Sequence, residues 1–243
     1  MDQALCRSCP LQRRYILQRV HALELGAGGE RRLDVLQKVT QPRCDELILD
    51  GTQPRRAFGM RSAHVMQPYP SHLVQRLTLG DGTAVTIRPI RPEDGGIEQE
   101  FVRQLSDESR YYRFRDAVRE LSPRMLSHLT RVDYDRHMAL IAVSERDGHE
   151  IQIGVARYVA GGNHQHCEFA IAIADDWQRK GLGTRLMQAL MAAARAAGIR
   201  EMFGEVLASN HKMLQLTARL GFSARFDESD PRVMRVETKL GQA

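Results

Sequence analysis

The most informative segment of this 243-residue chain is Gln178-Arg179-Lys180-Gly181-Leu182-Gly183-Thr184, which follows an apolar strand and opens a long helix. Its glycines, two positions apart, let the backbone turn tightly so that several N–H groups point the same way. The first N–H groups of a helix have no partner within it, and its N-terminus favours anions. Arg179 and Lys180 add countercharge. The segment therefore indicates a diphosphate site; a glycine-rich connection that binds nothing is the alternative.

The flanking segments predict a mixed α/β domain. Residues 165–174 alternate strictly between two faces, as a strand does, and residues 181–197 carry apolar side chains at helical spacing. The predicted order is a hairpin at 77–88, three helices between 91 and 131, strands at 138–144, 151–159 and 165–174, a helix at 181–197, a strand at 201–207, a helix at 210–220, and strands near 222–226 and 233–239.

The turn has neither Walker A spacing nor the dinucleotide G-x-G-x-x-G spacing, because Met187 and Gln188 stand where a third small residue would fall. Q-x-x-G-x-G after an alternating strand instead resembles the acetyl-CoA motif of the GNAT superfamily of N-acetyltransferases. Asn210, before a helix that ends in Leu220-Gly221-Phe222, resembles the second cofactor segment of that family. Four further segments resemble bacterial protein lysine acetyltransferases: residues 69–73, 85–94, 109–114 and 133–136.

The resemblance covers residues 69–240 and implies the GNAT fold, a mostly antiparallel central sheet with flanking helices and a cofactor cleft between splayed central strands. It implies acetyl-CoA as co-substrate. Main-chain groups of the strand would hold the pantetheine arm and polarise the thioester carbonyl, and the turn would hold the pyrophosphate. The cofactor-binding residues that the resemblance implies are Phe169, Ile171, Ala172, Ile173, Gln178, Arg179, Lys180, Gly181, Leu182, Gly183, Thr184 and Asn210.

Glu168 is the candidate general base. A lysine amine has a reference pKa near ~10.4, so it needs to lose a proton before it can attack at neutral pH. A carboxylate within hydrogen-bond reach can accept that proton, and apolar neighbours are expected to raise its pKa toward neutrality. Glu168 lies on the strand before the turn and matches the position of the glutamate in the enzymes it resembles. The alternative is a solvated glutamate on the strand surface.

Other reactive residues near this strand are weaker candidates. Strand alternation places Cys167 on the opposite face from Glu168, which favours a core thiol over a covalent acetyl-cysteine. His164 and His166 are expected to be surface residues. Thr217 stands where many relatives that acetylate small amines have a tyrosine acid, so the protonation of the leaving thiolate is open. The segment Arg110–Arg113 lies where the family frames its acceptor cleft.

Three functions follow from these residues. The first is acetyl transfer from acetyl-CoA to a protein lysine by direct attack. The second is acetylation of a small amine, and the third is a CoA-binding regulatory module without turnover. Thr217 and the segments quoted above favour the first, and Glu168 argues against the third.

The sequence predicts no functional site in the remainder of the chain. Residues 1–66 read as a weakly structured or flexible extension, and residues 67–243 as the catalytic domain. The extension holds 11 of the 35 Lys and Arg residues, scattered rather than clustered, which does not predict nucleic-acid binding. Cys6 and Cys9 have the spacing of half a zinc site, but the second half is missing, so no metal is expected.

The composition also bears on where the protein is located in the cell. The longest apolar runs are six residues, at 138–143, 169–174 and 189–194, so neither a transmembrane helix nor a membrane partner is expected. No apolar signal segment is evident, and four cysteines do not make a disulfide framework. We therefore expect a cytoplasmic protein, with its oligomeric state left open.

Overall fold

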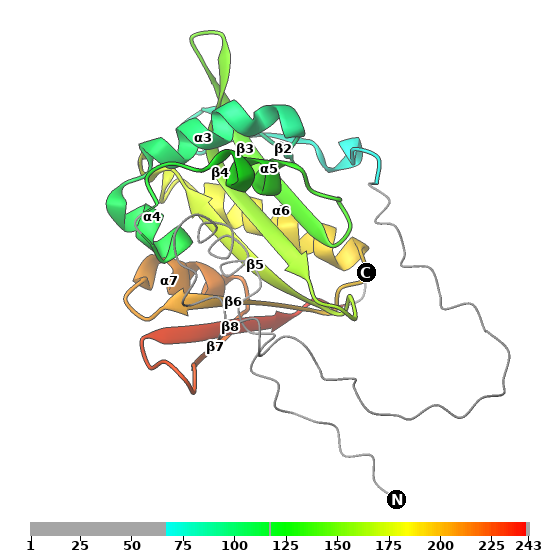
Figure 1. Cartoon of the computed structure of the whole chain (residues 1–243), viewed down its shortest axis with the longest axis vertical. Helices are drawn as coiled ribbons and strands as arrows, with labels where there is room; N and C mark the ends of the chain where they lie inside the picture. The colour runs from blue at the N-terminus through cyan, green and yellow to red at the C-terminus, as the bar shows by residue number, and fades with distance from the viewer. Residues whose placement is uncertain (1–66, 117, 242–243) are drawn as a thin grey trace, which may run out of the picture.

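The computed structural model describes residues 67–116 and 118–241. In this part of the chain, eight strands form one sheet in the order β1-β2-β3-β4-β5-β6-β8-β7 (Figure 1). The strands are β1 (Gln75–Thr78), β2 (Ala84–Pro89), β3 (His137–Arg146), β4 (His149–Ala160), β5 (His166–Ile173), β6 (Glu201–Leu207), β7 (Ser223–Phe226) and β8 (Val233–Lys239). All neighbouring pairs are antiparallel except β5 and β6.

Helices cover both faces of this sheet. They are α3 (Gly95–Gln104), α4 (Asp107–Phe114), α5 (Pro123–Thr130), α6 (Leu182–Ala196) and α7 (His211–Arg219), with short 3-10 turns η2 (Ser71–Leu73), η3 (Pro92–Asp94) and η4 (Asp175–Trp177). The predicted order of strands and helices is confirmed in the described residues. The predicted extension at 1–66, with Cys6 and Cys9, lies outside them.

The apolar run 138–143 explains why the sheet is covered on both faces. On β3, Met138, Leu140 and Ala142 join one apolar cluster with the helix α6. The alternate residues Ala139, Ile141 and Val143 join a second cluster with α3 and α5. A strand buried on both faces reads as a continuous apolar run, as the sequence does here.

Side-chain caps fix where the helices beside β5 and β6 begin. The Ser106 hydroxyl accepts a hydrogen bond from the Ser109 N–H at 3.2 Å and starts α4. The Asn210 side chain accepts one from the Met213 N–H at 3.1 Å and starts α7. Such caps satisfy N–H groups that the helix itself leaves without a partner.

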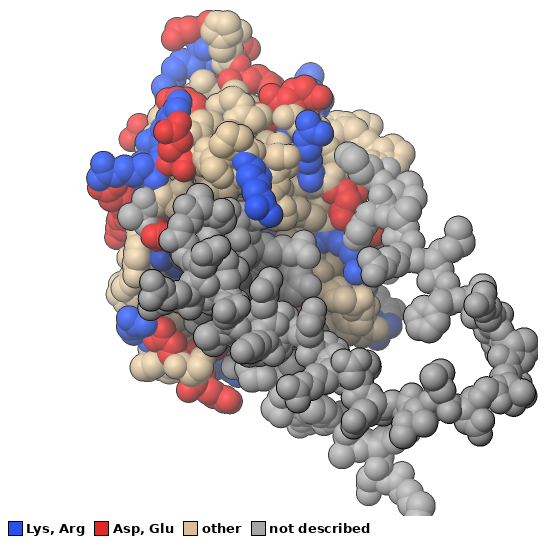
Figure 2. Space-filling view, in the orientation of Figure 1, with Lys and Arg blue, Asp and Glu red and all other residues tan. Residues whose placement is uncertain are grey.

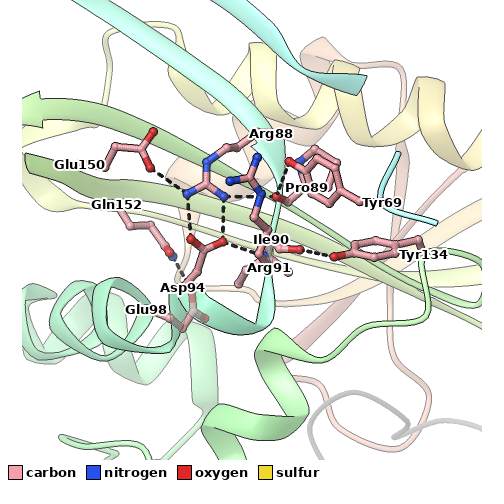
Figure 3. Close-up of polar contacts among 10 residues, drawn as sticks. All are labelled: Tyr69, Arg88, Pro89, Ile90, Arg91, Asp94, Glu98, Tyr134, Glu150 and Gln152. Atoms are coloured by element: carbon pink, nitrogen blue, oxygen red, sulfur yellow. Dashed lines mark hydrogen bonds and ion pairs between the residues drawn. The ribbon is translucent and has the colours of Figure 1, made fainter. Parts of the chain in front are cut away.

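A buried ion pair braces the connection from β2 to α3. Arg88 donates two hydrogen bonds to Asp94, at 2.7 and 2.8 Å, and a third to Glu150 on β4 at 2.9 Å (Figure 3). Asp94 also accepts a hydrogen bond from the Arg91 N–H at 2.6 Å. This arrangement fixes the backbone of the segment 85–94 that the sequence analysis singled out.

Two tyrosines complete that brace. The Tyr69 hydroxyl donates to the Pro89 carbonyl at 3.2 Å, and the Tyr134 hydroxyl donates to the Ile90 carbonyl at 2.7 Å (Figure 3). The two rings meet edge to face, with centroids 5.9 Å apart. Segments 69–73, 85–94 and 133–136 therefore meet in one structural cluster.

The described surface carries mixed charge. On the face drawn in Figure 2, basic and acidic side chains lie beside one another over the strands and helices that are visible. Among the described residues, no helix combines the length and the apolar character that crossing a membrane would require.

Candidate active site

The strands β5 and β6 separate partway along the sheet. Their parallel pairing joins His166 to Glu201, Cys167 to Met202 and Glu168 to Phe203. Beyond this point, β5 stays paired with β4 and β6 stays paired with β8. Backbone groups of β5 after Glu168 are thereby released from the ladder with β6, which leaves them available to a ligand.

The ring of Phe169 lies against β6 where the strands separate. A Cβ atom added to Gly204 would come within 2.7 Å of this ring, so only glycine lets the ring pack there. The ring also packs against Phe222, with centroids 5.3 Å apart. The aromatic side chain thus packs between Gly204 and Phe222 where the two strands separate.

The predicted diphosphate turn connects η4 to α6. Arg179 and Gly181 both adopt left-handed backbone conformations, with φ of 60° and 83°. A non-glycine residue in this region is uncommon, and successive N–H groups in such turns form anion-binding concavities. The backbone therefore has the shape that the glycine spacing predicts.

The Gln178 side chain holds the turn in place. Its amide donates to the Ile173 carbonyl at 3.2 Å and to the Ser109 hydroxyl at 3.3 Å. Its oxygen accepts a hydrogen bond from Lys212 on α7 at 3.2 Å. One side chain therefore links the turn to β5, α4 and α7.

Asp175 ties the start of α4 to the same region. It accepts hydrogen bonds from the Ser106 N–H, the Ser106 hydroxyl and the Ser109 hydroxyl at 2.7–2.9 Å. Burial opposes the charge of this carboxylate, but these hydrogen bonds outweigh burial and lower the pKa of Asp175. Asp175 therefore connects α4 to the turn as an ionised group.

A larger cavity of about 290 Å³ lies between the turn, β5, α4 and α7. The ionisable side chains along it are mostly cationic: Arg113, Arg179, Lys212 and Arg219 against the single carboxylate Glu108. This balance and the left-handed turn favour an anionic ligand. The predicted cofactor-binding residues that line it are Ile171, Ala172, Ile173, Gln178, Arg179, Gly181, Gly183, Thr184 and Asn210.

Three predicted cofactor residues lie elsewhere. Phe169 lines the adjoining smaller cavity, and the Leu182 side chain is buried in the apolar core. The Lys180 ammonium lies 3.1 Å from Asp81 and 5.1 Å from the centre of the Trp177 ring, outside the larger cavity. The positive charge of Lys180 is therefore already paired with the carboxylate of Asp81.

The smaller cavity, of about 50 Å³, fills the gap between β5 and β6. It adjoins the larger cavity, because both are lined by Tyr112, Arg113, Ile171, Asn210 and Met213. Its ionisable residues are Glu168 on β5, Glu205 on β6, and Arg113 and Arg115 from the end of α4. Ionisable side chains of both signs thus meet at the split in the sheet.

Glu168 is a buried residue with an exposed fraction of 6%. It does not lie in solvent, as the alternative reading of the sequence required. Burial lowers the pKa of the nearby Arg113 to about 10, with a further contribution from Arg157, while the charges of Glu98 and Glu168 act in the opposite direction. Arg113 therefore still carries its positive charge beside Glu168 at neutral pH.

The weaker candidates lie away from both cavities. Cys167 is fully buried in the apolar cluster, and burial, followed by the charge of Glu168, raises the pKa of its thiol. His164 lies 3.4 Å from Asp135, and His166 lies 3.5 Å from Glu201.

Thr217 is also buried, and its hydroxyl donates to the Met213 and Leu214 carbonyls within α7, each at 3.1 Å. It lines neither cavity. We therefore assign it no role toward a leaving group.

The segment Arg110–Arg113 contributes two residues to the site. Tyr112 and Arg113 line both cavities, and the Tyr112 hydroxyl donates to the Ser209 carbonyl at 3.4 Å across the gap between α4 and α7. Arg110 instead pairs with Asp107 within α4, and Tyr111 is exposed.

Sequence reasoning missed Arg115, Glu205, Lys212 and Arg219. The last two lie seven residues apart on α7, on the same helical face as Leu216, and that spacing is a signal the sequence contains. Arg115 and Glu205 carry no comparable local signal, because they are 90 positions apart and meet only through the tertiary fold.

Comparisons with known proteins identify relatives of this chain. The model of the acetyltransferase (GNAT) family matches residues 100–222. An acetyltransferase of Pseudomonas aeruginosa is 39% identical over 153 residues, which are 63% of this chain and 82% of that protein. The acetyltransferase Pat of Mycolicibacterium smegmatis is 32% identical over 136 residues, covering 56% of this chain and 40% of that protein.

A solved structure is similar in fold. The GNAT domain of PAT from S. lividans matches with a TM-score of 0.65 at 29% identity. The match covers 71% of this chain and 99% of that domain.

Proposed function

The chain belongs to the acetyltransferase (GNAT) family, which makes it an acetyl-CoA-dependent enzyme that acetylates an amine, and we propose that this amine is the side chain of a protein lysine. The observation that carries the proposal is the buried carboxylate of Glu168 in the smaller cavity, beside the larger cavity that suits acetyl-CoA.

The larger cavity fits the anionic part of acetyl-CoA. We assign the pyrophosphate to the N–H groups of residues 179–184, with the side chains of Arg179, Lys212 and Arg219 as countercharge. The pantetheine arm would bind the backbone of residues 171–173 on the released edge of β5. Asn210 caps α7 through its side-chain oxygen, so its NH₂ group remains for the thioester end.

The reaction then needs two proton transfers and one displacement. A lysine ammonium loses a proton to Glu168, and the neutral nitrogen attacks the thioester carbonyl carbon. A bond forms between nitrogen and this carbon, the carbon–sulfur bond breaks, and CoA leaves as the thiolate. The nitrogen gives up its second proton as the amide forms, and the thiolate takes it up directly or through solvent. A main-chain N–H near residues 169–171 would stabilise the negative charge that develops on the carbonyl oxygen.

The size of the smaller cavity supports a slender acceptor. Its volume of about 50 Å³ suits the end of an extended alkyl-ammonium chain better than a bulky small molecule. The lysine side chain has this shape. Segments 69–73, 85–94 and 133–136 also support the proposal through their resemblance to protein lysine acetyltransferases, although they meet in the brace around Arg88 rather than at the cavities.

Labelled acetyl-CoA tests the acceptor class. The full chain is incubated with labelled acetyl-CoA and cell protein, or with a panel of small amines. We expect label on protein lysines, located by mass spectrometry, at a rate well above that of the Glu168→Gln variant. This variant also controls for non-enzymatic acetylation. Label confined to small amines, or protein label that is equal with both enzymes, would overturn the proposal.

A further inference from the structure

A second carboxylate lies at the split in the sheet. Glu205 is two residues beyond Phe203, which pairs with Glu168 in the parallel ladder. Residues paired across a sheet share a face, and so do residues two apart on a strand. Glu168 and Glu205 thus belong to the same face, one on each side of the gap, and both line the smaller cavity.

Glu205 forms a long ion pair with Arg115, the residue that ends α4. Nη1 of Arg115 lies 3.4 Å from Oε2 of Glu205, and the two side chains are 25% and 13% exposed. A charge-assisted hydrogen bond is commonly about 2.7–2.9 Å long, so this contact is longer than a tight pair. Nη2 of Arg115 is buried and has no hydrogen-bond partner among the described residues. The guanidinium therefore lines this cavity with its Nη2 donor left unsatisfied.

Arg115 also has a second acidic neighbour. Hydrogen bonds from Arg232 come first in lowering the pKa of Asp230 to about 2, and the charge of Arg115 adds to this effect. Asp230 lies in the connection from β7 to β8. A guanidinium that leaves Glu205 therefore remains close to negative charge.

We propose that Glu205 binds the ammonium group of the acceptor, and that Arg115 occupies this position until the acceptor displaces it. The inference rests on the proposed function, because it concerns the same site. An amine acceptor arrives protonated at neutral pH and is held as a cation before Glu168 removes its proton. Arg113 already offsets the charge of Glu168, whereas replacing the loose Arg115 contact exchanges one cation for another. Glu205 thus selects cationic acceptors, and Arg115 competes with them.

Two substitutions distinguish this role from a structural one. If the pair only fastens α4 to β6, Glu205→Gln and Arg115→Gln remove the same contact and shift the kinetics in the same direction. The proposal expects opposite directions. Glu205→Gln should raise the acceptor KM roughly tenfold, as loss of a charged hydrogen-bond partner does. Arg115→Gln should lower the acceptor KM about threefold, because a competing cation is gone.

The controls use the same readouts. The acetyl-CoA KM and the melting temperature should change little in either variant. Glu120→Gln, in an exposed pair with Arg103, should match the wild type throughout. If Glu205→Gln folds poorly, Glu205→Asp keeps the charge and should retain most of the acceptor affinity. Acceptor KM values that move the same way in both cavity variants, or in neither, would overturn the inference.

The choice of acceptor separates this inference from the proposed function. Rates are measured with a lysine peptide and with a blocked single lysine. If the enzyme acetylates small amines but no protein, the proposed function fails, while opposite shifts with the blocked lysine still support the role of Glu205. If neither acceptor turns over, binding of the blocked lysine to the CoA complex is measured by NMR titration. The same opposite shifts are then expected in Kd, and their absence overturns the inference.

Discussion

The larger cavity joins the glycine turn and the strand β5 to one face of α7, whereas the smaller cavity brings together two carboxylates and two guanidinium groups from β5, β6 and α4. Backbone groups that bind a ligand tolerate side-chain changes but not changes of backbone shape. Ionisable side chains that act on a reacting atom depend on single atoms. Substitutions that change the backbone shape of the turn should therefore lower the affinity for acetyl-CoA at the larger cavity. Substitutions of single charged side chains at the smaller cavity should instead lower turnover.

The largest effect is expected in the smaller cavity. Glu168→Gln keeps the shape of the side chain but cannot accept the proton, so kcat should fall roughly 10²–10⁴-fold. Acetyl-CoA affinity should change little. The rate of the variant should rise with pH, because the unprotonated fraction of an amine with a pKa near ~10.4 increases about tenfold per pH unit. The measurement is the pH–rate profile of both proteins at saturating acetyl-CoA.

A matched carboxylate in the larger cavity provides the control. Glu108→Gln removes an acid that lines only that cavity, so kcat should stay within about twofold of the wild type. A Glu168→Gln enzyme with near-normal turnover at pH 7 would remove Glu168 from the mechanism. A loss without recovery at high pH would instead indicate a positional role.

The second effect is expected at the turn. Gly183 is the second residue of α6, and an added Cβ would lie 3.4 Å from the Leu216 side chain, an ordinary contact. Gly183→Val should therefore fold, while its added methyl groups crowd the cavity. We expect acetyl-CoA affinity by calorimetry to fall roughly tenfold or more, with a smaller loss for Gly183→Ala. Unchanged affinity in a folded Gly183→Val protein would exclude this turn as the pyrophosphate site.

Two adjacent cations offer a finer comparison within the turn. Arg179 lines the larger cavity, whereas Lys180 pairs with Asp81 outside it. Arg179→Ala should lower acetyl-CoA affinity about three- to tenfold, and Lys180→Ala should change it by less than about twofold. The affinities are measured at low and at physiological salt, since exposed charges are screened. Equal losses would mean that the Lys180 ammonium leaves Asp81 when acetyl-CoA binds.

The same contrast explains which features of the fold and of the site the sequence predicts. The solved relative confirms the GNAT fold. This fold was predictable because its elements follow from local patterns: the apolar run 138–143, the cap Ser106 and the glycine turn at 181–183. Much of the lining of the larger cavity was predictable for the same reason, because it comes from the glycine turn and the strand before it. Even there, the pattern could not reveal that Asp81, about a hundred positions earlier, pairs with Lys180.

Of the charged residues that line the smaller cavity, the sequence pointed to Glu168, which strand alternation places on the face opposite Cys167, and to Arg113 in the segment 110–113. Arg115 and Glu205 meet because the C-terminal end of α4 reaches β6, and no local pattern encodes this contact. The family resemblance also pointed to segments that prove to be structural. Arg88 and Asp94 within 85–94 brace the start of α3 rather than line a cavity.

A smaller effect is expected at Asp175, which ties α4 to η4 and lines neither cavity. Asp175 receives three hydrogen bonds from α4, and its pKa lies below the ordinary value despite burial. A depressed carboxylate pKa stabilises the fold above the unfolded-state pKa of about 3.9, and this stability is lost as pH falls through the folded-state value. Asp175→Asn should thus cost about 1 kcal/mol at pH 7. The difference in urea-unfolding free energy from the wild type should shrink below about pH 4, and a difference independent of pH would contradict this electrostatic role.

The smallest effect is expected from removing residues 1–66. The described residues that line either cavity all lie between Glu108 and Arg219. The first described backbone contact, from the Gln67 N–H to the Asp133 carbonyl, is retained in a chain that begins at residue 66 or 67. Such a chain should melt within a few degrees of the full protein and keep kcat/KM within about twofold. A marked fall in melting temperature or turnover would make residues 1–66 part of the domain. Acetyl-CoA affinity and acceptor KM would then tell which of the two cavities those residues complete.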